Sequence, residues 1–336
     1  MKVNLVSKSI FVKEGHGVFT AFRSQVDGLR RYSDIQLSVD SRRTNFDITH
    51  LHTYGFAALW RLLFTGGKKV ITVHVIPESL IGSIVGARYW LPLMRAYMKF
   101  IYSRADIILA VSPKAAESLV SMGIKKPIRV LFNGIEMKDF AVRSEEKNAA
   151  KERLGIDRSA FVVVGNGQIQ ARKRFDLFCE VAEQLPNMTF LWIGGSPFGR
   201  LSDDFSRLQR LIEHPPKNVI VTGVIPYSEV RGFMAAADVL WLPSMQENHP
   251  MAVLEAAGAG LPLLLRDIPE YDQSFGNDIL RGTDRTFEAQ LKQLKDDPEY
   301  YVAAVSGARR IAHRFDNKSV IKELLQIYEE LLQDRA

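Results

Sequence analysis

Two glutamates, Glu247 and Glu255, lie eight positions apart in DVLWLPSMQENHPMAVLEAAGAGLPLLL, residues 238–265. The apolar pattern of this stretch predicts a buried strand, a polar loop, a helix and a second buried strand. Four residues occupy the expected helix start: Asn248, His249, Pro250 and Met251. Backbone N–H groups at a helix start lack helical acceptors and face the positive end of the dipole. Such a corner can bind phosphate with its amides and sugar hydroxyls with its carboxylates, although a solvent-exposed capping pair is the simpler alternative.

A second polar loop follows the expected buried strand FVVV near residue 161, in FVVVGNGQIQARKRF. Gly165 and Gly167 leave room for a ligand to approach the backbone. Three cations follow within the same loop: Arg172, Lys173 and Arg174. Cations beside a glycine loop can neutralise a diphosphate without a metal. A solvated basic loop is the alternative, and the two-glutamate corner is what favours a phosphate site.

Histidines and glycines mark candidate ligand positions in the first half of the chain. Gly15 and Gly17 stand between an expected first strand and its helix, where glycine admits a ligand, although a plain tight turn fits equally well. His74 ends the expected strand VITVHV, and ligands of open α/β sheets bind at the carboxyl ends of strands. His50 and His52 have no third metal ligand in view, so we expect strand-end residues, one facing inward and one outward.

Residues 77–105 combine cations with aromatic side chains in one expected helix. A basic and aromatic amphipathic helix can lie at the surface of an anionic membrane. The alternative is a crossover helix whose aromatic residues pack on the sheet, and composition does not choose between the two. The candidate membrane-facing residues are Arg88, Trp90, Arg95 and Lys99.

Composition narrows the class of protein. Residues 1–140 hold 20 Lys+Arg and 10 Asp+Glu, and the remaining residues hold 24 and 28, so the net charge of +6 is concentrated in the first half. A basic half attracts anionic lipid, phosphorylated ligands or nucleic acid, but no nucleic-acid recognition motif accompanies the charge. The single cysteine, Cys179, suggests a reducing cytosol and a core position. No apolar run has the length of a membrane span or signal peptide, so we expect a cytoplasmic protein.

Strands and helices are expected to alternate along the whole chain, which predicts an α/β fold with two parallel sheets. A charged stretch in the middle, RSEEKNAAKERLG, reads as a linker and entry helix. The expected organisation is a first Rossmann-like domain over 1–141, a linker over 142–158, a second Rossmann-like domain over 159–316 and a terminal helix over 317–336. The apolar residues of the terminal helix recur at helical spacing.

These motifs resemble the family 4 glycosyltransferases, retaining enzymes of the two-Rossmann-domain (GT-B) kind that use nucleotide sugars. The resemblance rests on the Glu-x7-Glu pair within AADVLWLPS and GAGLPLLL, and on an "SP…L…G…NGI" ending of the first domain. It implies an interdomain cleft, and a terminal helix that crosses back to the first domain. His74 matches the family's histidine that contacts the transferred sugar, and Lys173 matches its phosphate lysine. The arginine that many members carry earlier in the phosphate loop is Gln168 here, and Arg172 or Arg174 is left to supply that charge.

A closer similarity links the chain to bacterial glycolipid glycosyltransferases that extend a monoglycosyl-diacylglycerol. It is carried by EGHGVFTAFR, ITHLHTYGF, VHVIPESLIGSIVGA, VGNGQIQARK, WIGGSPFGR, HPPKNV and LPLLLRDIPEY. Two departures concern the site: the usual YNEL is MQEN at 245–248, and the usual LRDLDLY is LRDIPEY at 265–271. These differences leave the particular sugar and acceptor open.

The resemblance implies transfer of a hexose from a UDP-sugar to a hydroxyl of a membrane glycolipid, with retention, at the inner face of the cell membrane. His74, Lys173 and Glu247 are the expected catalytic residues, and no metal cofactor is expected. The expected donor site comprises Gly15, Gly17, Gly165, Gly167, Gln168, Arg172, Lys173, Asn248, His249, Pro250, Met251 and Glu255. A glycosyltransferase with a soluble acceptor and a non-catalytic nucleotide-sugar-binding module are the alternatives. Glucose or galactose as the donor sugar, the linkage and the oligomeric state stay open.

Overall fold

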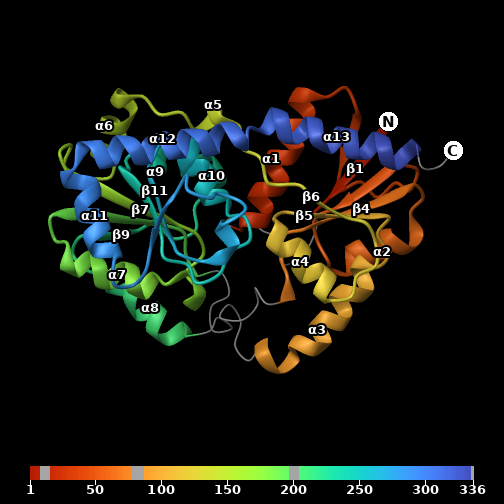
Figure 1. The fold of residues 1–336 in the computed structure, drawn as a ribbon, viewed down its shortest axis with the longest axis horizontal. Coiled ribbons are helices and arrows are strands. Elements are labelled where there is room, and N and C mark those ends of the chain that lie inside the picture. The colour runs from red at the N-terminus through yellow and green to blue at the C-terminus, as the bar shows by residue number, and fades with distance from the viewer. Residues whose placement is uncertain (8–15, 78–86, 197–203, 334–336) are drawn as a thin grey trace. The chain divides into compact units, whose positions relative to one another are not determined.

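The computed structural model describes residues 1–7, 16–77, 87–196 and 204–333 (Figure 1). The chain forms two compact units. Within the described residues, the first unit comprises 1–136 together with 315–333, and the second comprises 137–314. Each unit is built on a parallel six-stranded sheet, so the expected α/β class with two parallel sheets is confirmed.

The sheet of the first unit has the order β2-β1-β3-β4-β5-β6, with every neighbouring pair parallel. Its strands are β1 (Lys2–Val6), β2 (Gln36–Val39), β3 (Ile48–Leu51), β4 (Lys68–Val73), β5 (Ile107–Ala110) and β6 (Ile128–Val130). The chain direction across the sheet reverses between β1 and β3, because β2 lies on one side of β1 and all later strands lie on the other. Ligands of open α/β sheets bind at the carboxyl ends of strands beside such a reversal.

Helices cover both faces of this sheet. They are α1 (Gly17–Tyr32), α2 (Phe56–Phe64), α3 (Ala87–Tyr102), α4 (Pro113–Ser121) and α13 (Asn317–Gln333). One apolar cluster joins α1 and α13 to the sheet, and a second joins α2, α3 and α4 to it. The start of α4 is capped by a side chain: the Ser112 hydroxyl accepts a hydrogen bond from the Ala115 N–H, with Pro113 in the first turn.

The terminal helix α13 is held to the first unit by polar contacts as well as by its apolar side. The side-chain amide of Asn317 donates to the Ser24 carbonyl at 3.0 Å, and the backbone N–H of Asn317 donates to the Ile135 carbonyl at 2.9 Å. A Cβ at Gly28 would lie 2.6 Å from the Asn317 side chain, so glycine is required where α1 meets α13. The end of the chain therefore completes the core of the unit that contains its beginning.

The sheet of the second unit has the order β12-β11-β10-β7-β8-β9, again with every pair parallel. Its strands are β7 (Phe161–Asn166), β8 (Met188–Ile193), β9 (Val219–Val221), β10 (Val239–Leu242), β11 (Leu263–Arg266) and β12 (Leu280–Gly282). β7 and β10 are neighbours at the centre, where the strand order reverses. The loops that follow these two strands therefore meet at one edge of the sheet.

Helices again flank this sheet, and an aromatic core lies beneath one face. The helices are α5 (Met137–Phe140), α6 (Ser144–Arg153), α7 (Phe175–Gln184), α8 (Phe205–Glu213), α9 (Tyr227–Met234), α10 (Met251–Gly258), α11 (Phe287–Asp296) and α12 (Pro298–Arg314), with short 3-10 turns η2 (Ala171–Lys173) and η4 (Pro269–Tyr271). Phe178 stacks on Trp241 with ring centroids 5.3 Å apart and meets Trp192 edge-on at 5.0 Å. Cys179 is buried among these residues, as expected, and burial raises the pKa of its thiol to about 12.

Candidate functional site

The phosphate-loop candidate and the two-glutamate corner come together in the second unit. Because β7 and β10 are parallel neighbours, η2 after β7 lies beside the loop after β10. The Met245 N–H donates to the Arg172 carbonyl at 2.8 Å, and the Arg172 guanidinium donates to the Gln246 carbonyl at 3.0 Å. The two loops thus form one hydrogen-bonded corner at the carboxyl edge of the sheet.

A buried ion pair occupies this corner. The Lys173 ammonium donates to a Glu247 carboxylate oxygen, and a guanidinium nitrogen of Arg172 lies 3.9 Å from the other oxygen. Lys173 and Glu247 are 8% and 7% exposed. Burial by itself would raise the pKa of the Glu247 carboxyl, but Lys173 and Arg172 together hold that pKa below its ordinary value. Two cations face one carboxylate, so the corner keeps an excess of positive charge.

Arg174 contributes no charge to the corner, because it is committed elsewhere. Its guanidinium donates to the Asp176 carboxylate at 3.1 Å and to the Asp284 carboxylate at 2.9 Å. The backbone of Arg174 is left-handed, with φ of 56°, where η2 ends and α7 begins. Of the two arginines left open by the sequence, Arg172 is the one that lies beside Glu247.

The two glycines of the phosphate loop serve different purposes. A Cβ at Gly165 would lie 2.5 Å from the Trp192 ring, so this glycine is required by the core and not by ligand access. Gly167 has φ of 148°, a region that favours glycine, and lies against the Lys173 side chain. The Trp192 indole N–H donates to the Gly167 carbonyl at 3.0 Å and fixes the loop over the core.

The second glutamate of the pair, Glu255, lies one turn into α10 and is 2% exposed. It accepts a hydrogen bond from the Asn166 amide at 2.9 Å, and the Tyr227 hydroxyl also bonds to it. Burial raises the pKa of Glu255 to about 7 despite these two donors. Sequence analysis did not single out Asn166 or Tyr227; the strand-end position of Asn166 was the available signal.

The start of α10 differs in part from the expectation. Met251 begins the helix, and Pro250, the residue at the cap position, makes no side-chain capping hydrogen bond. Asn248 is half-buried and accepts a weak hydrogen bond from Gln246 at 3.4 Å. His249 is 3% exposed and its ring stacks on Phe275 at 5.3 Å; burial lowers its pKa to about 3, so the ring is neutral.

Several buried polar atoms near the corner make no hydrogen bond within the described residues. They include the side-chain nitrogen of Gln168 and the hydroxyl oxygen of the fully buried Tyr271. Burial, and then the charge of Glu247, raise the pKa of Tyr271. Buried polar groups usually find a partner, and unpaired ones gather at functional sites. Tyr271 was missed by the sequence analysis; its position within LRDIPEY, one of the two departures noted above, was the signal.

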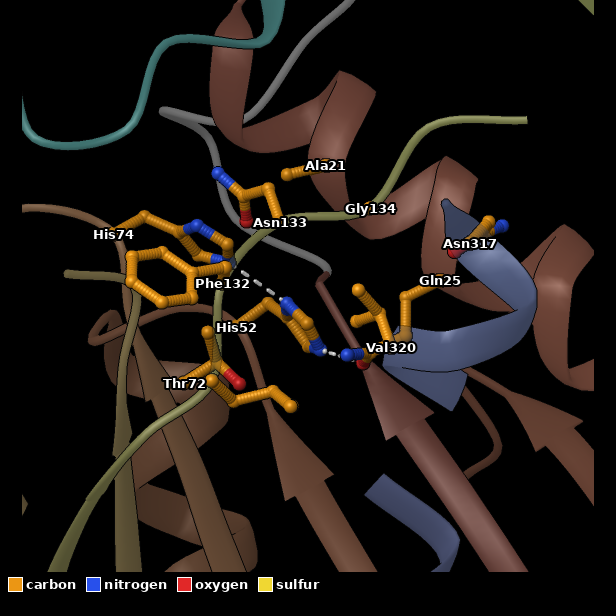
Figure 2. A pocket seen from close by; sticks show the side chains of 11 residues that line it. Ala21, Gln25, His52, Thr72, His74, Phe132, Asn133, Gly134, Asn317 and Val320 are labelled. Atoms are coloured by element: carbon orange, nitrogen blue, oxygen red, sulfur yellow. Dashed lines mark hydrogen bonds between the residues drawn. The ribbon is translucent and has the colours of Figure 1, made fainter. Parts of the chain in front are cut away.

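A second candidate site lies wholly within the first unit, at the reversal between β1 and β3. Figure 2 shows a small pocket there that is lined by residues from α1, from the ends of β3 and β4, from the segment 131–134 after β6, and from α13. His74 follows β4, and its Nε2 lies 2.9 Å from Nδ1 of His52, which follows β3. The Nε2 of His52 lies 2.8 Å from the side-chain oxygen of Gln25 on α1.

The expectation for His50 and His52 was wrong in one respect, because neither faces outward. His50 is fully buried and His52 is 4% exposed. Residues two apart in a strand share a face, so both rings lie on the same side, with centroids 4.5 Å apart. His50 bonds to the Tyr328 hydroxyl of α13 and to the Thr72 hydroxyl of β4, each at 2.6 Å, which ties the terminal helix to the sheet.

The remaining candidates lie in two places. Gly17 begins α1 and is exposed, while Gly15 lies outside the described residues. Along α3, Arg95 and Lys99 are exposed and Trp90 is half-buried; the side chain of Arg88 lies outside the described part of the chain.

Among the described residues, no helix combines the length and apolarity that a membrane span requires, and no group of three or more His, Cys, Asp or Glu side chains is arranged to hold a metal ion.

Two open parallel α/β units, each with polar groups at the reversal of strand order, define the GT-B class of proteins. Solved structures of similar fold agree: HepE of Anabaena, solved with UDP-glucose, has a TM-score of 0.80 at 15% identity over 98% of this chain and 100% of its own. The sucrose-phosphate synthase of Thermosynechococcus elongatus has a TM-score of 0.81 at 15% identity over 99% of both chains. The expected fold is confirmed.

Sequence comparison gives the family. Residues 12–139 match the family described as Glycosyltransferase Family 4, and residues 158–297 match Glycosyl transferases group 1. The alpha-galactosylglucosyldiacylglycerol synthase of Streptococcus pneumoniae is 30% identical over 98% of this chain and 90% of its own. The processive diacylglycerol alpha-glucosyltransferase of Acholeplasma laidlawii is 26% identical over 99% of both. The chain belongs to the family 4 glycosyltransferases, as the motifs predicted.

Proposed function

We propose that this glycosyltransferase moves a hexose from a UDP-sugar to a hydroxyl of a diacylglycerol-based glycolipid, with retention at the anomeric carbon. The observation that carries the proposal is the buried corner of Lys173, Arg172 and Glu247 at the central strand reversal of the second unit. The acceptor class is supported by the names of the two relatives, a galactosylglucosyldiacylglycerol synthase and a diacylglycerol glucosyltransferase. The donor class is supported by HepE, which shares the fold and binds UDP-glucose.

The corner provides what a diphosphate needs. Lys173 and Arg172 carry two positive charges in a site with little water, where charge-assisted hydrogen bonds are strong. The backbone amides at the start of α10 add donors and the positive end of a helix dipole. Arg172, and not Arg174, supplies the charge that many family members place at the position of Gln168.

When UDP leaves, negative charge builds on the β-phosphate while positive charge builds on the sugar, and the enzyme must stabilise both charges. Lys173, Arg172 and the α10 amides stabilise the first charge, so the proposal requires no bound metal. The leaving phosphate itself accepts the proton of the incoming hydroxyl on the same face of the sugar. This front-face route accounts for retention without a nucleophilic carboxylate.

The remaining residues hold the donor in place. Glu247 accepts hydrogen bonds from hydroxyls of the hexose, and Glu255 accepts them from the ribose. Glu247 is ready for this role because its low pKa keeps it ionised. His74 contacts the transferred sugar, as the matching histidine does in the family that the sequence resembles.

A lipid acceptor needs a membrane-facing surface, and we propose that the exposed apolar side chains of α2 and α3, which we call the α2–α3 outer face, provide it. Its apolar members are Phe56, Trp60, Leu63, Phe64, Tyr89, Leu93 and Phe100, which are between 44% and 86% exposed. The opposite sides of the same helices are buried in one apolar cluster on the sheet. The helix at 87–102 therefore both packs on the sheet and exposes aromatic residues, so the two alternatives for it are not exclusive.

Cations accompany these apolar residues. Arg95 and Lys99 are exposed on α3, and the Arg104 guanidinium lies 3.3 Å from the centroid of the Phe100 ring. Aromatic rings at headgroup depth with cations against anionic lipid are typical of interfacial helices. We place the enzyme in the cytoplasm, peripherally attached to the inner face of the cell membrane by this surface.

The test is UDP release from UDP-glucose and from UDP-galactose, with liposomes that contain diacylglycerol, monoglucosyl-diacylglycerol or neither. Release that requires one lipid and one donor supports the proposal and names both substrates. Equal release without lipid, or release stimulated by a soluble sugar phosphate, would instead support a soluble acceptor. UDP binding with no release under any condition would support a non-catalytic nucleotide-sugar-binding module.

A further inference from the structure

Tyr271 is a fully buried tyrosine whose hydroxyl makes no hydrogen bond within the described residues. Its backbone is held in place, because the Tyr271 carbonyl accepts from the N–H groups of Phe275 at 2.9 Å and Gly276 at 3.1 Å. The unpaired hydroxyl therefore belongs to a hydrogen-bonded turn of the second unit. Leaving a buried hydroxyl unpaired costs stability, which suggests a partner that binds from outside the chain.

The topology of the second sheet places Tyr271 beside the corner of Lys173 and Glu247. The turn η4 ends at Tyr271 and follows β11, which neighbours β10 on the side away from β7. Because these strands are parallel, the loops after β7, β10 and β11 leave the same carboxyl edge side by side. Lys173 comes from the first of these loops, Glu247 from the second and Tyr271 from the third.

Ring contacts also connect Tyr271 to the loop that carries Glu247. The Tyr271 ring meets Phe275 with centroids 5.4 Å apart, and Phe275 stacks on His249, two residues after Glu247, at 5.3 Å. The charges agree with this placement. Burial raises the pKa of Tyr271 most, the charge of Glu247 raises it further, and Arg172 lowers it. Tyr271 keeps its proton and is therefore an O–H donor at the corner.

A hexose hydroxyl at Glu247 needs such a donor. In the proposed function Glu247 accepts the proton of that hydroxyl, and an ionised carboxylate has no hydrogen to give in return. The oxygen of the sugar hydroxyl is then buried and costly to leave unpaired. Lys173 and Arg172 are assigned to the diphosphate, whose charge they match. The Tyr271 hydroxyl is neutral and has no partner within the described residues, which suits a neutral sugar oxygen.

We propose that Tyr271 is a further donor-binding residue, whose O–H donates a hydrogen bond to a hydroxyl oxygen of the transferred hexose beside Glu247. Its burial is shared by the residues that the proposed function assigns to the donor, since Lys173 and Glu247 are 8% and 7% exposed. A donor that reaches those two side chains displaces part of what covers the corner. The inference rests on the donor site of the proposed function, and it adds a residue that recognises the hexose and not the UDP.

Binding measurements separate the hexose from the UDP. Tyr271→Phe removes the hydroxyl and keeps the ring against Phe275. Calorimetric titration without an acceptor is expected to show unchanged affinity for UDP. Affinity for UDP-glucose or UDP-galactose, whichever the wild-type protein binds more tightly, is expected to fall about three- to tenfold, the effect of losing one neutral hydrogen bond. Unchanged affinity for that UDP-hexose would overturn the proposal. An equal loss for UDP would do so as well, because the contact would then be with the nucleotide.

Deoxy donors identify the hydroxyl that Tyr271 contacts. Each hydroxyl of the hexose is removed in turn, and the affinities of wild-type and Tyr271→Phe proteins are compared. Removal of the contacted hydroxyl is expected to weaken binding to the wild-type protein and to leave the two proteins equal. The other deoxy donors should keep the difference between them. A difference that persists for every deoxy donor rules out a contact with a hexose hydroxyl.

Thermal unfolding tests whether the hydroxyl is unpaired in the free protein. Tyr271→Phe is expected to raise the unfolding temperature by about 1–4 °C, because it removes a buried polar group that has no partner. Tyr301→Phe is the matched control, since the Tyr301 hydroxyl donates to the Asp238 carbonyl at 3.0 Å, before β10 and so at the opposite edge of the same sheet. The control is expected to unfold at a lower temperature and to keep both affinities. A lower unfolding temperature for Tyr271→Phe with unchanged hexose affinity would show a structural role and overturn the proposal.

The outcomes keep the two proposals apart. Lipid-dependent sugar transfer by the wild-type enzyme, with unchanged hexose affinity in Tyr271→Phe, leaves the proposed function standing and removes the role of Tyr271. Hexose affinity that is lost in Tyr271→Phe, with no sugar transfer by the wild-type protein to any lipid, overturns the proposed reaction and keeps the Tyr271 contact. A wild-type protein that binds neither UDP-hexose overturns both.

Discussion

Lys173 and Glu247 are separated by 74 positions in the chain and form a buried ion pair at the carboxyl edge of the second sheet. Breaking such a pair leaves one charge buried without its partner, which costs about 3–5 kcal/mol. The proposed function makes catalysis depend on the same two side chains. Mutants that remove one charge and mutants that remove both separate the two effects.

Lys173→Met is expected to lower turnover by two or more orders of magnitude, roughly the effect of losing a charge that stabilises a transition state. It is also expected to lower the unfolding temperature, because Glu247 stays buried and, within the described residues, keeps Arg172 at 3.9 Å as its one cationic partner. The double variant Lys173→Met/Glu247→Gln is expected to recover much of the stability but none of the activity. Lys292→Met is the control, since Lys292 is exposed and its ion-pair partner, Glu288, lies on its own helix. Activity recovered along with stability would contradict the phosphate role.

Arg172 and Arg174 are expected to differ although they are two positions apart. Arg172→Gln should weaken UDP binding about tenfold or more, because its charge lies in the corner. Arg174→Gln should leave UDP binding nearly unchanged and lower stability, because its partners are Asp176 and Asp284. Calorimetric titration with UDP measures the first effect and thermal unfolding the second. The reverse pattern would assign the phosphate role to Arg174.

Glu247→Gln separates the sugar from the diphosphate. Removing a negative charge beside two cations is expected to preserve or tighten UDP binding, while turnover with the UDP-hexose falls by about 100-fold or more. UDP titration and initial rates on the same preparation check both parts. Glu288→Gln removes an exposed carboxylate from the same unit and serves as the matched control. Equal loss of UDP binding and turnover would mean that Glu247 acts only by shaping the phosphate site.

The raised pKa of Glu255 predicts that the stability of the folded chain depends on pH. Its pKa is raised from 4.5 to about 7, so between these values the folded chain holds a proton that the unfolded chain has released. The free energy of unfolding therefore falls as pH rises from the unfolded pKa toward the folded one, by at most roughly 3 kcal/mol. Glu255→Gln should remove this contribution, which denaturant titrations of both proteins at several pH values would reveal. Parallel curves for the two proteins would show that Glu255 titrates normally.

The ribose role of Glu255 is tested with uridine, which carries no phosphate to titrate. An ionised carboxylate is the better acceptor for ribose hydroxyls, so uridine should bind more tightly at about pH 8 than at about pH 6. Glu255→Gln should bind uridine more weakly and without this pH dependence. Uridine affinity that is equally pH-dependent in both proteins would place its origin elsewhere.

The α2–α3 outer face predicts membrane binding that depends on apolar side chains and on charge. Co-sedimentation with vesicles of phosphatidylglycerol and phosphatidylcholine should exceed that with phosphatidylcholine alone and should fall with added salt. Trp60→Ser/Phe64→Ser should reduce binding to both kinds of vesicle, and Lys99→Glu only the anionic preference. Val302→Ser is the control, because Val302 is 63% exposed on the second unit. Equal vesicle binding by all four proteins would rule this face out.

Local patterns predicted most of the strands and helices, because most of them show either an apolar run or a clear period. β12, Leu280–Gly282, was missed because its sequence, LRG, has neither. The outward orientation of one strand-end histidine was also wrong, because His50 and His52 share a face and both are covered by polar partners from α1, β4 and α13. The elements that cover these two histidines come from distant parts of the chain, so the alternation of residues within the strand does not indicate them.

The sequence by itself determined the α/β class and the family, because the spacing of Glu247 and Glu255 and the glycines and cations after the first strand of the second unit are local features. Only the tertiary structure decided how those residues pair. It placed Lys173 and Arg172 beside Glu247, committed Arg174 to two aspartates, assigned Gly165 to the aromatic core and joined Gln25 to His52 and His74. The physical reason is that these contacts depend on which strands are neighbours at the centre of each sheet, and strand order is set by long-range packing, not by any pattern within a single segment.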